Sequence, residues 1–290
     1  MKLAANLNEI PDPVFSVKTD LEQCAIKPNR LKGQNFLISS RVRDYIANVA
    51  NLTETDSVIE IGPGTGVLTW ALAHKTTNLT LVESERSLAA LLKKRFKILD
   101  KVNVICGDGL QFLRKLVTEH NHHKWKIVSN LPYSISSPVL MTMADNPEIF
   151  EGGVLLLQKE VVDRVTATPM DPERSAISVI LQLRYSVRKV LNVKSSQFRP
   201  APGVDSAVLT LNPGGESLSV PWHYLIRTVQ EMFVHRRKTL LNNLKKCMSN
   251  AMAETVLLAS GIEMDKRAQE LTLKQFVKLA ETKLRAETEI

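Results

Sequence analysis

The sequence predicts an α/β protein with a doubly wound, mostly parallel sheet, followed by a small all-α C-terminal domain. Short apolar runs alternate with helical patterns between about residues 40 and 210. After Asn212-Pro213-Gly214-Gly215, the apolar residues recur only at helical spacing. A chain of 290 residues is long enough for two domains. We therefore expect a flexible N-terminal extension at 1–26, a sheet domain at 27–212 and a helical domain at 213–290.

The strands of this sheet are predicted from runs that are short, apolar and rich in β-branched residues. These runs cover residues 57–61, 79–83, 102–106, 125–129, 153–157 and 205–211. The last run alternates apolar and polar residues, as expected of a strand that closes the sheet. Helices are expected at 67–74, 160–165 and 178–185, and a terminal helix at 271–284. No internal repeat interrupts this order.

The first predicted strand runs into a glycine loop, Gly62-Pro63-Gly64-Thr65-Gly66. Glycines at this spacing let the backbone approach a ligand closely, but Val67 stands where the dinucleotide fingerprint requires a third glycine. The loop therefore fits an adenosyl ligand with an amino-acid tail better than a pyrophosphate. A tight strand-to-helix turn, which is common in α/β domains, explains the same residues.

Acidic residues follow the next two strands. Glu83 ends the second strand about 20 residues beyond the glycines, the distance at which an acid reaches a ribose diol in a βαβ unit. Glu85 is the alternative for that contact. Asp108 follows the third strand, where it can accept a hydrogen bond from an adenine amine. Each acid alone could be a solvated loop residue, but ligands of open α/β sheets bind beyond the carboxyl ends of strands.

The fourth strand leads into Asn130-Leu131-Pro132-Tyr133. Proline removes a backbone donor and fixes φ, so a neighbouring carbonyl can point outward. The Asn130 oxygen and the Leu131 carbonyl can accept both hydrogens of an exocyclic amine, and Tyr133 offers a face for stacking. This motif suits chemistry on the N6 amine of adenine, although the same letters also form ordinary turns.

Together these motifs resemble the ribosomal RNA adenine dimethyltransferases of the KsgA type. The resemblance covers roughly residues 27–285 and includes further segments of the family: Gly33-Gln34-Asn35-Phe36-Leu37, Leu157-Gln158-Lys159-Glu160-Val161, Phe198-Arg199-Pro200-Ala201-Pro202-Gly203-Val204-Asp205-Ser206 and Phe233-Val234-His235-Arg236-Arg237-Lys238-Thr239-Leu240. One departure is Ser134, where many bacterial members carry Asn. The resemblance implies a Rossmann-like class I methyltransferase that dimethylates two adjacent adenosines of small-subunit (16S) ribosomal RNA during ribosome biogenesis.

The resemblance also implies a set of site residues. S-adenosyl-L-methionine would be bound by a group of polar, glycine and strand-end residues: Asn35, Leu37, Gly62, Gly64, Glu83, Asp108 and Asn130. Catalysis would rest on Asn130, Leu131, Tyr133 and Phe198, with the two aromatic rings enclosing the target adenine. The alternatives are an Erm-type methyltransferase of large-subunit ribosomal RNA, a DNA adenine methyltransferase and a ribosome assembly factor without catalytic activity.

The charge of the chain favours a nucleic-acid partner. The net charge is +8, and basic residues without acids cluster in windows at 23–43, 184–204 and 234–250. From these windows we expect RNA contacts at Arg30, Lys32, Arg199, Arg236, Arg237 and Lys238. Solvation of helix faces is the ordinary alternative for such runs. We expect a monomer that acts on ribosomal RNA in an immature small subunit.

The cysteines and the N-terminal residues indicate a cytoplasmic protein without a metal. Cys24, Cys106 and Cys247 lack metal-ligand spacing and are expected to be free thiols, with Cys106 packed at a strand end. No apolar stretch reaches the roughly 18 residues of a membrane helix. The first 26 residues contain acids and lack the apolar core of a secretory signal.

Overall fold

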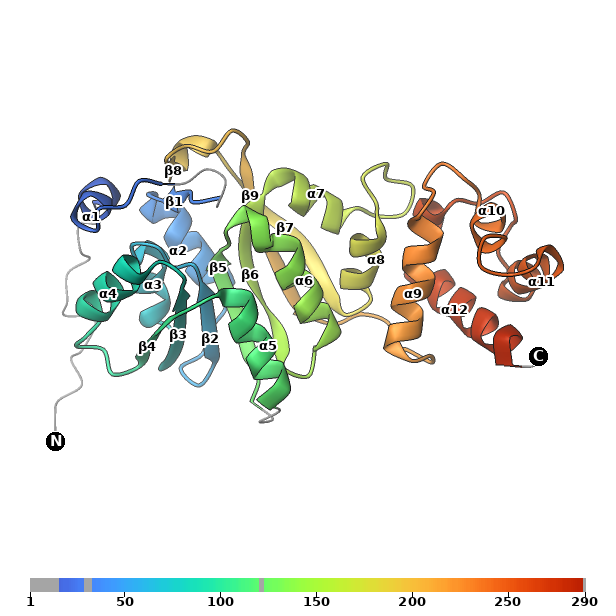
Figure 1. Ribbon diagram of the computed structural model, residues 1–290, viewed down its shortest axis with the longest axis horizontal. Coiled ribbons are helices and arrows are strands. Elements are labelled where there is room, and N and C mark those ends of the chain that lie inside the picture. The colour runs from blue at the N-terminus through green and yellow to red at the C-terminus, as the bar shows by residue number, and fades with distance from the viewer. Residues whose placement is uncertain (1–15, 29–32, 120–122, 289–290) are drawn as a thin grey trace. The chain divides into compact units, whose positions relative to one another are not determined.

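The computed structural model describes residues 16–28, 33–119 and 123–288. In these residues a seven-stranded sheet has the order β4-β3-β2-β5-β6-β9-β7 (Figure 1). Its strands are β2 (Ser57–Ile61), β3 (Asn78–Glu83), β4 (Val102–Cys106), β5 (Trp125–Asn130), β6 (Phe150–Gln158), β7 (Tyr185–Val193) and β9 (Ser206–Pro213). All strands predicted from the sequence are present in this sheet.

The register of the parallel strands brings their carboxyl ends to one edge. β2 pairs with β3 and β5, β3 pairs with β4, and β5 pairs with β6, all in parallel. Ile61 lies opposite Val82, and Glu83 lies opposite Cys106, so neighbouring strands end at nearly the same level. Within this sheet, β9 runs antiparallel to its neighbour β6. The doubly wound, mostly parallel sheet expected from the sequence is confirmed.

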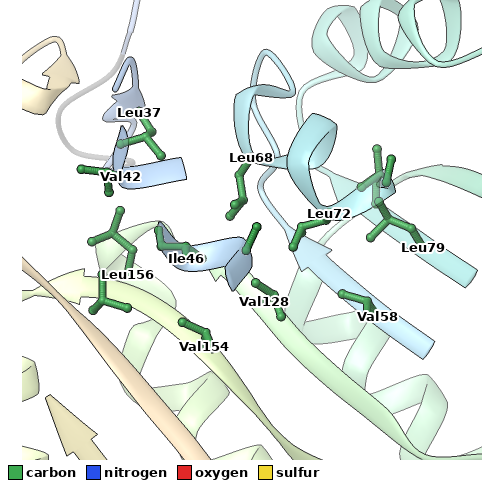
Figure 2. Packing of buried hydrophobic residues seen from close by; sticks show 14 of the residues in the cluster. Leu37, Val42, Ile46, Val58, Leu68, Leu72, Leu79, Val128, Val154 and Leu156 are labelled. Carbon is green, nitrogen blue, oxygen red and sulfur yellow. The ribbon is translucent and has the colours of Figure 1, made fainter. Parts of the chain in front are cut away.

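One face of the sheet is covered by helices α2 (Ser40–Val49), α3 (Val67–Ala73) and α4 (Arg86–Arg95). Figure 2 shows Ile46 and Leu72 from two of these helices above Val58 and Val128 of the central strands. Side chains alternate along a strand, so the neighbours of Val58 face the opposite side. There Gly109, the first residue of α5 (Gly109–Glu119), lies against Ile61. α6 (Ser136–Asp145) contacts β6, and α7 (Lys159–Thr166) follows that strand.

The C-terminal part is helical, as expected. Its helices are α9 (Trp222–Phe233), α10 (Leu240–Leu244), α11 (Asn250–Ser260) and α12 (Leu273–Thr288), whereas α8 (Ala176–Gln182) lies earlier in the chain. Phe233 of α9 stacks on Phe276 of α12 with ring centroids 5.9 Å apart. Lys283 is fully buried and lies 3.2 Å from Glu231 and 2.9 Å from Glu287. None of the helices in the described residues is long and apolar enough to cross a membrane.

The chain divides into two compact units, and this division differs from the predicted one at residues 163–187. The first unit contains residues 1–162 and 188–212, and the second contains 163–187 and 213–290. Residues 163–187, which we expected in the sheet domain, belong to the helical unit because α8 packs against α9. The backbone also ties the segment to that unit, since Glu216 N–H donates to the Leu183 carbonyl.

The N-terminal extension expected at 1–26 contains a helix in its second half. Residues 1–15 lie outside the described residues, but α1 (Val17–Gln23) is a helix. Its first turn is capped by Ser16, whose hydroxyl oxygen accepts a hydrogen bond from Thr19 N–H. Val17 and Leu21 are buried against the sheet unit, and this burial stabilises a helix too short to form alone.

Two further expectations need correction. The helix predicted at 178–185 ends at Gln182, and Tyr185 begins β7. Because Tyr185–Val193 alternates only weakly, its extended structure depends on its neighbour β9 in the sheet. Cys106 is exposed and not packed, because β4 is an edge strand. All three cysteines are free.

Candidate active site

A cavity of about 460 Å³ lies at the carboxyl edge of the sheet, a volume typical of small-ligand sites. Its walls come from the segment around β1 (Phe36–Leu37), the glycine loop and the residues that follow β3, β4 and β5. The predicted residues that line it are Asn35, Leu37, Gly62, Gly64, Glu83, Asp108, Asn130, Leu131 and Tyr133. The fold thus brings residues that lie as far apart in the sequence as Asn35 and Tyr133 into the wall of one cavity.

The glycine loop has a left-handed backbone that favours glycine. Gly64 has φ +60°, and a Cβ there would lie 2.7 Å from the Phe36 ring. Gly62 has φ +65° and packs against Pro132 of the Asn130 motif. A side chain at either position would separate the loop from its neighbours, so these glycines set the shape of the cavity.

Glu83 is held at the end of β3 by the backbone. Its Oε2 accepts a hydrogen bond of 3.1 Å from Gly64 N–H, and its Oε1 accepts one of 2.9 Å from Glu85 N–H. Burial raises the pKa of the Glu83 carboxyl, and these backbone hydrogen bonds oppose that shift. Each carboxylate oxygen has a second lone pair, so Glu83 can still accept ligand hydroxyls. Glu85 occupies the N-cap position of α4 without a side-chain capping bond, and it is not among the described residues that line the cavity.

Glu60 is a site residue that the sequence analysis did not single out. It lines the cavity, is only 1% exposed, and its Oε2 accepts a 2.7 Å hydrogen bond from Thr69 Oγ1. Burial raises the pKa of Glu60 to about 8, and the nearby Glu83 adds to the rise. Glu60 therefore carries a proton near neutral pH. In the sequence it is the one charged residue of the run 57–61, and a carboxyl group in a buried strand is the signal that could have identified it.

Asp108 follows β4 and is exposed at the cavity. Its Oδ1 accepts a 2.8 Å hydrogen bond from Gln111 N–H in the first turn of α5. This bond fixes the carboxylate at the rim, where acceptors for a ligand amine are expected.

The motif after β5 places its polar groups toward the cavity. Asn130 Nδ2 donates a 3.0 Å hydrogen bond to the Asn35 carbonyl, which fixes the orientation of the amide. Oδ1 is therefore directed away from Asn35 and can accept from a ligand. The Tyr133 hydroxyl shares a 2.7 Å hydrogen bond with Ser206, and burial raises the pKa of this tyrosine. Leu131 N–H donates to the Leu156 carbonyl at 3.2 Å.

Phe198 lies apart from these residues. It pairs with Leu37 in the two-stranded sheet of β1 and β8 (Phe198–Arg199), and its side chain belongs to the hydrophobic core. Phe198 is 3% exposed and is not among the described residues that line the cavity. A ring this buried offers no face to a base in this conformation, in contrast to the role that the resemblance implies.

The basic residues predicted to contact RNA have different surroundings. Arg30 and Lys32 lie outside the described residues. Arg199, Arg237 and Lys238 are exposed. Arg236 is exposed as well, but its guanidinium donates hydrogen bonds to the carbonyls of Pro172 and Arg174.

Metal ligands do not gather in the described ranges. Among residues 16–28, 33–119 and 123–288, no group of three or more His, Cys, Asp or Glu residues could hold a metal ion.

Comparisons with known proteins give a consistent result. Residues 26–284 match the family model described as "Ribosomal RNA adenine dimethylase". "Ribosomal RNA small subunit methyltransferase A" of Geobacter metallireducens is 37% identical over 267 residues, 88% of this chain and 95% of that protein. The protein of the same name from Wolbachia pipientis is 32% identical over 281 residues, 95% of this chain and 96% of that protein.

Solved structures of similar fold include a dimethyladenosine transferase from Plasmodium falciparum. Its superposition on this chain has a TM-score of 0.73 at 24% sequence identity and covers 87% of this chain and 98% of that chain. The 23S rRNA methyltransferase ErmE has a TM-score of 0.68 at 25% identity, over 86% of this chain and 99% of that chain.

Proposed function

This chain belongs to the ribosomal RNA adenine dimethylase family, and on that premise we propose that it dimethylates the N6 amines of two adjacent adenosines in small-subunit (16S) ribosomal RNA. S-adenosyl-L-methionine supplies the methyl groups. The observation that carries the proposal is the cavity, because Glu83, Asp108 and Asn130 reach it from the ends of separate parallel strands. The proposed substrate associates the protein with immature small subunits in the cytoplasm, where it acts as a monomer.

The cavity residues fit the methyl donor. Glu83 has acceptor capacity left for a ribose diol, and Asp108 is an acceptor at the rim for an adenine amine. The left-handed turns at Gly62 and Gly64 let backbone groups approach the amino-acid tail. Asn35 and Leu37 complete the wall on the side of β1.

The proposed chemistry depends on Asn130 and Leu131. The N6 lone pair of adenine is delocalised into the ring, so the amine is a weak nucleophile. Acceptance of its hydrogens by Asn130 Oδ1 and the Leu131 carbonyl favours a pyramidal nitrogen and stabilises the positive charge that grows on it. The nitrogen–carbon bond forms as the methyl carbon leaves sulfur, and the proton then passes to water. Alignment of these atoms supplies much of the acceleration.

The target base must leave its stack, at a cost of a few kcal/mol. Stacking on Tyr133 offsets roughly 1–3 kcal/mol of that cost. The bond between the Tyr133 hydroxyl and Ser206 fixes the ring, so little entropy is lost when a base stacks on it.

The alternatives are less well supported. Relatives at 32–37% identity carry the small-subunit name, whereas the ErmE structure is 25% identical. A non-catalytic assembly factor would not need to retain Glu83, Asp108, Asn130 and Tyr133 around one cavity. Exposed Arg237 and Lys238 are suited to phosphate contacts in the RNA.

Transfer of tritium from labelled S-adenosyl-L-methionine tests the proposal. Small subunits that lack adenine dimethylation are compared with large subunits and duplex DNA as acceptors. Label in small-subunit RNA alone supports the proposed substrate. Label in the large subunit would favour the Erm-type alternative, and RNA binding without label would favour the assembly factor.

A further inference from the structure

Helix α1 lies outside the family match, which begins at residue 26. It has one buried face, formed by Val17, Asp20 and Leu21, and an exposed face that carries the surface ion pair of Lys18 and Glu22. A buried carboxylate on so short a helix needs a partner, because an unpaired buried charge is costly. Figure 1 shows α1 beside β1 and α4.

The apolar residues of α1 pack behind the cavity. Val17 and Leu21 form a cluster with Phe36, Val67 and Leu88. The latter three residues also line the cavity. Displacement of α1 would therefore expose the back of the wall that faces the ligand.

The polar contact of α1 reaches the glycine loop through one side chain. Arg95, in the last turn of α4, places its guanidinium 2.6 Å and 3.1 Å from the two carboxylate oxygens of Asp20. The same guanidinium donates to the backbone carbonyl of Thr65, between Gly64 and Gly66. The Asp20 side chain is 8% exposed and that of Arg95 22% exposed, so the pair is largely shielded from water.

This arrangement holds the glycine loop from two sides. Glu83 accepts the Gly64 N–H on one side, and Arg95 donates to the Thr65 carbonyl on the other. The paired carboxylate restricts the planar guanidinium to one orientation. Without Asp20, the Arg95 guanidinium would lose the carboxylate that orients it, and its hold on the Thr65 carbonyl would weaken.

We propose that docked α1, acting through Asp20 and Arg95, holds the glycine loop in the shape that binds the methyl donor, so that cofactor affinity and α1 docking are coupled. The proposal rests on the proposed function, since it concerns the same cavity. Asp20 and Arg95 are positioning residues in this account. Because coupling is reciprocal, the bound cofactor must stabilise α1 to the same extent that α1 stabilises the cofactor.

Calorimetric titration of the full chain with S-adenosylhomocysteine tests the first half of the coupling. We expect Asp20→Ala to weaken binding by about 10-fold, within the usual range of coupling between sites. Glu22→Ala is the matched control, because it removes a carboxylate from the exposed face of the same helix, and it should change affinity by less than about twofold. In methyl transfer, Asp20→Ala should raise KM for S-adenosyl-L-methionine and leave kcat unchanged.

A double-mutant cycle separates this role from general destabilisation. If Asp20 acts through Arg95, Asp20→Ala should cause little further loss of affinity when Arg95→Ala is already present. Hydrogen exchange tests the second half of the coupling: S-adenosylhomocysteine should slow exchange of the amides of residues 17–23 in the wild type, and much less in Asp20→Ala.

The outcomes distinguish this proposal from the proposed function. Equal affinity of the wild type and Asp20→Ala, or α1 exchange that the ligand does not change, would overturn the coupling alone. A wild-type chain that binds no S-adenosylhomocysteine would overturn the proposed function and the coupling together.

Discussion

Replacement of the buried Glu60 by glutamine should stabilise the protein. Glu60 is 1% exposed and accepts a hydrogen bond from Thr69, and burial raises its pKa to about 8. The variant Glu60→Gln retains the carbonyl acceptor for Thr69 and has the size of the protonated acid. It therefore reproduces the neutral form at every pH, without the cost of ionising the side chain or of keeping it protonated.

The size of the effect follows from the two pKa values. An ordinary glutamate ionises near pH 4.5, whereas Glu60 in the folded protein ionises near pH 8. Between these limits the folded state binds a proton that the unfolded state has released, so the free energy of unfolding falls by about 1.4 kcal/mol per pH unit as the pH rises. At pH 7 the accumulated loss is about 3 kcal/mol. Glu60→Gln should escape this loss.

Urea unfolding followed by circular dichroism at several pH values measures the prediction. The stability difference between Glu60→Gln and the wild type should be small near pH 4.5 and grow to about 3 kcal/mol at pH 7. Glu22→Gln, at an exposed carboxylate, is the control and should show no such growth. A difference that stays constant with pH, or a variant less stable than the wild type at pH 7, would refute the reasoning about Glu60.

The remaining predictions concern the site and the C-terminal helices. Asn130→Ala should lower kcat by about 10²–10³-fold with S-adenosyl-L-methionine affinity largely retained, and a variant with normal kcat would remove the proposed acceptor role. Glu83→Ala should weaken cofactor binding in calorimetry by about 10- to 100-fold, because it removes hydrogen bonds to a charged group, and unchanged affinity would assign the ribose contact elsewhere. Arg237→Ala should reduce the slope of log affinity for RNA against log salt concentration by about 0.7–0.9. Arg236→Ala should also lower the melting temperature, because Arg236 donates to two backbone carbonyls, and equal melting temperatures would contradict this distinction. Lys283→Met leaves the carboxylates of Glu231 and Glu287 without their buried cation and should lower the free energy of unfolding by about 3 kcal/mol. An unchanged midpoint of urea unfolding would contradict the role of these ion pairs.

The strands and the position of the cavity could be predicted because both depend on local patterns. Apolar runs predict buried parallel strands, and the parallel order alone brings Glu83, Asp108 and Asn130 to one edge. Glu60 could not be predicted in this way, because its role depends on the contact with Thr69 and on burial.

The sequence-based expectations differed from the structure at positions where contacts between distant parts of the chain determine the local structure. The α1 helix is short, and isolated helices of this length are not stable. It is stabilised by packing against Phe36, Val67 and Leu88, which lie elsewhere in the chain. β7 depends on its neighbour β9 in the same manner. For Phe198, the family resemblance implies a ring that faces the target base, whereas the structure buries that ring beside Leu37.

Nucleoside mass spectrometry tests the central claim most directly. Small subunits that lack adenine dimethylation are incubated with S-adenosyl-L-methionine and either the wild type or Asn130→Ala, and the RNA is then digested. The account predicts dimethyladenosine at two adjacent positions with the wild type and almost none with the variant. Small-subunit RNA without dimethyladenosine after reaction with the wild type, or equal amounts from both proteins, would contradict it.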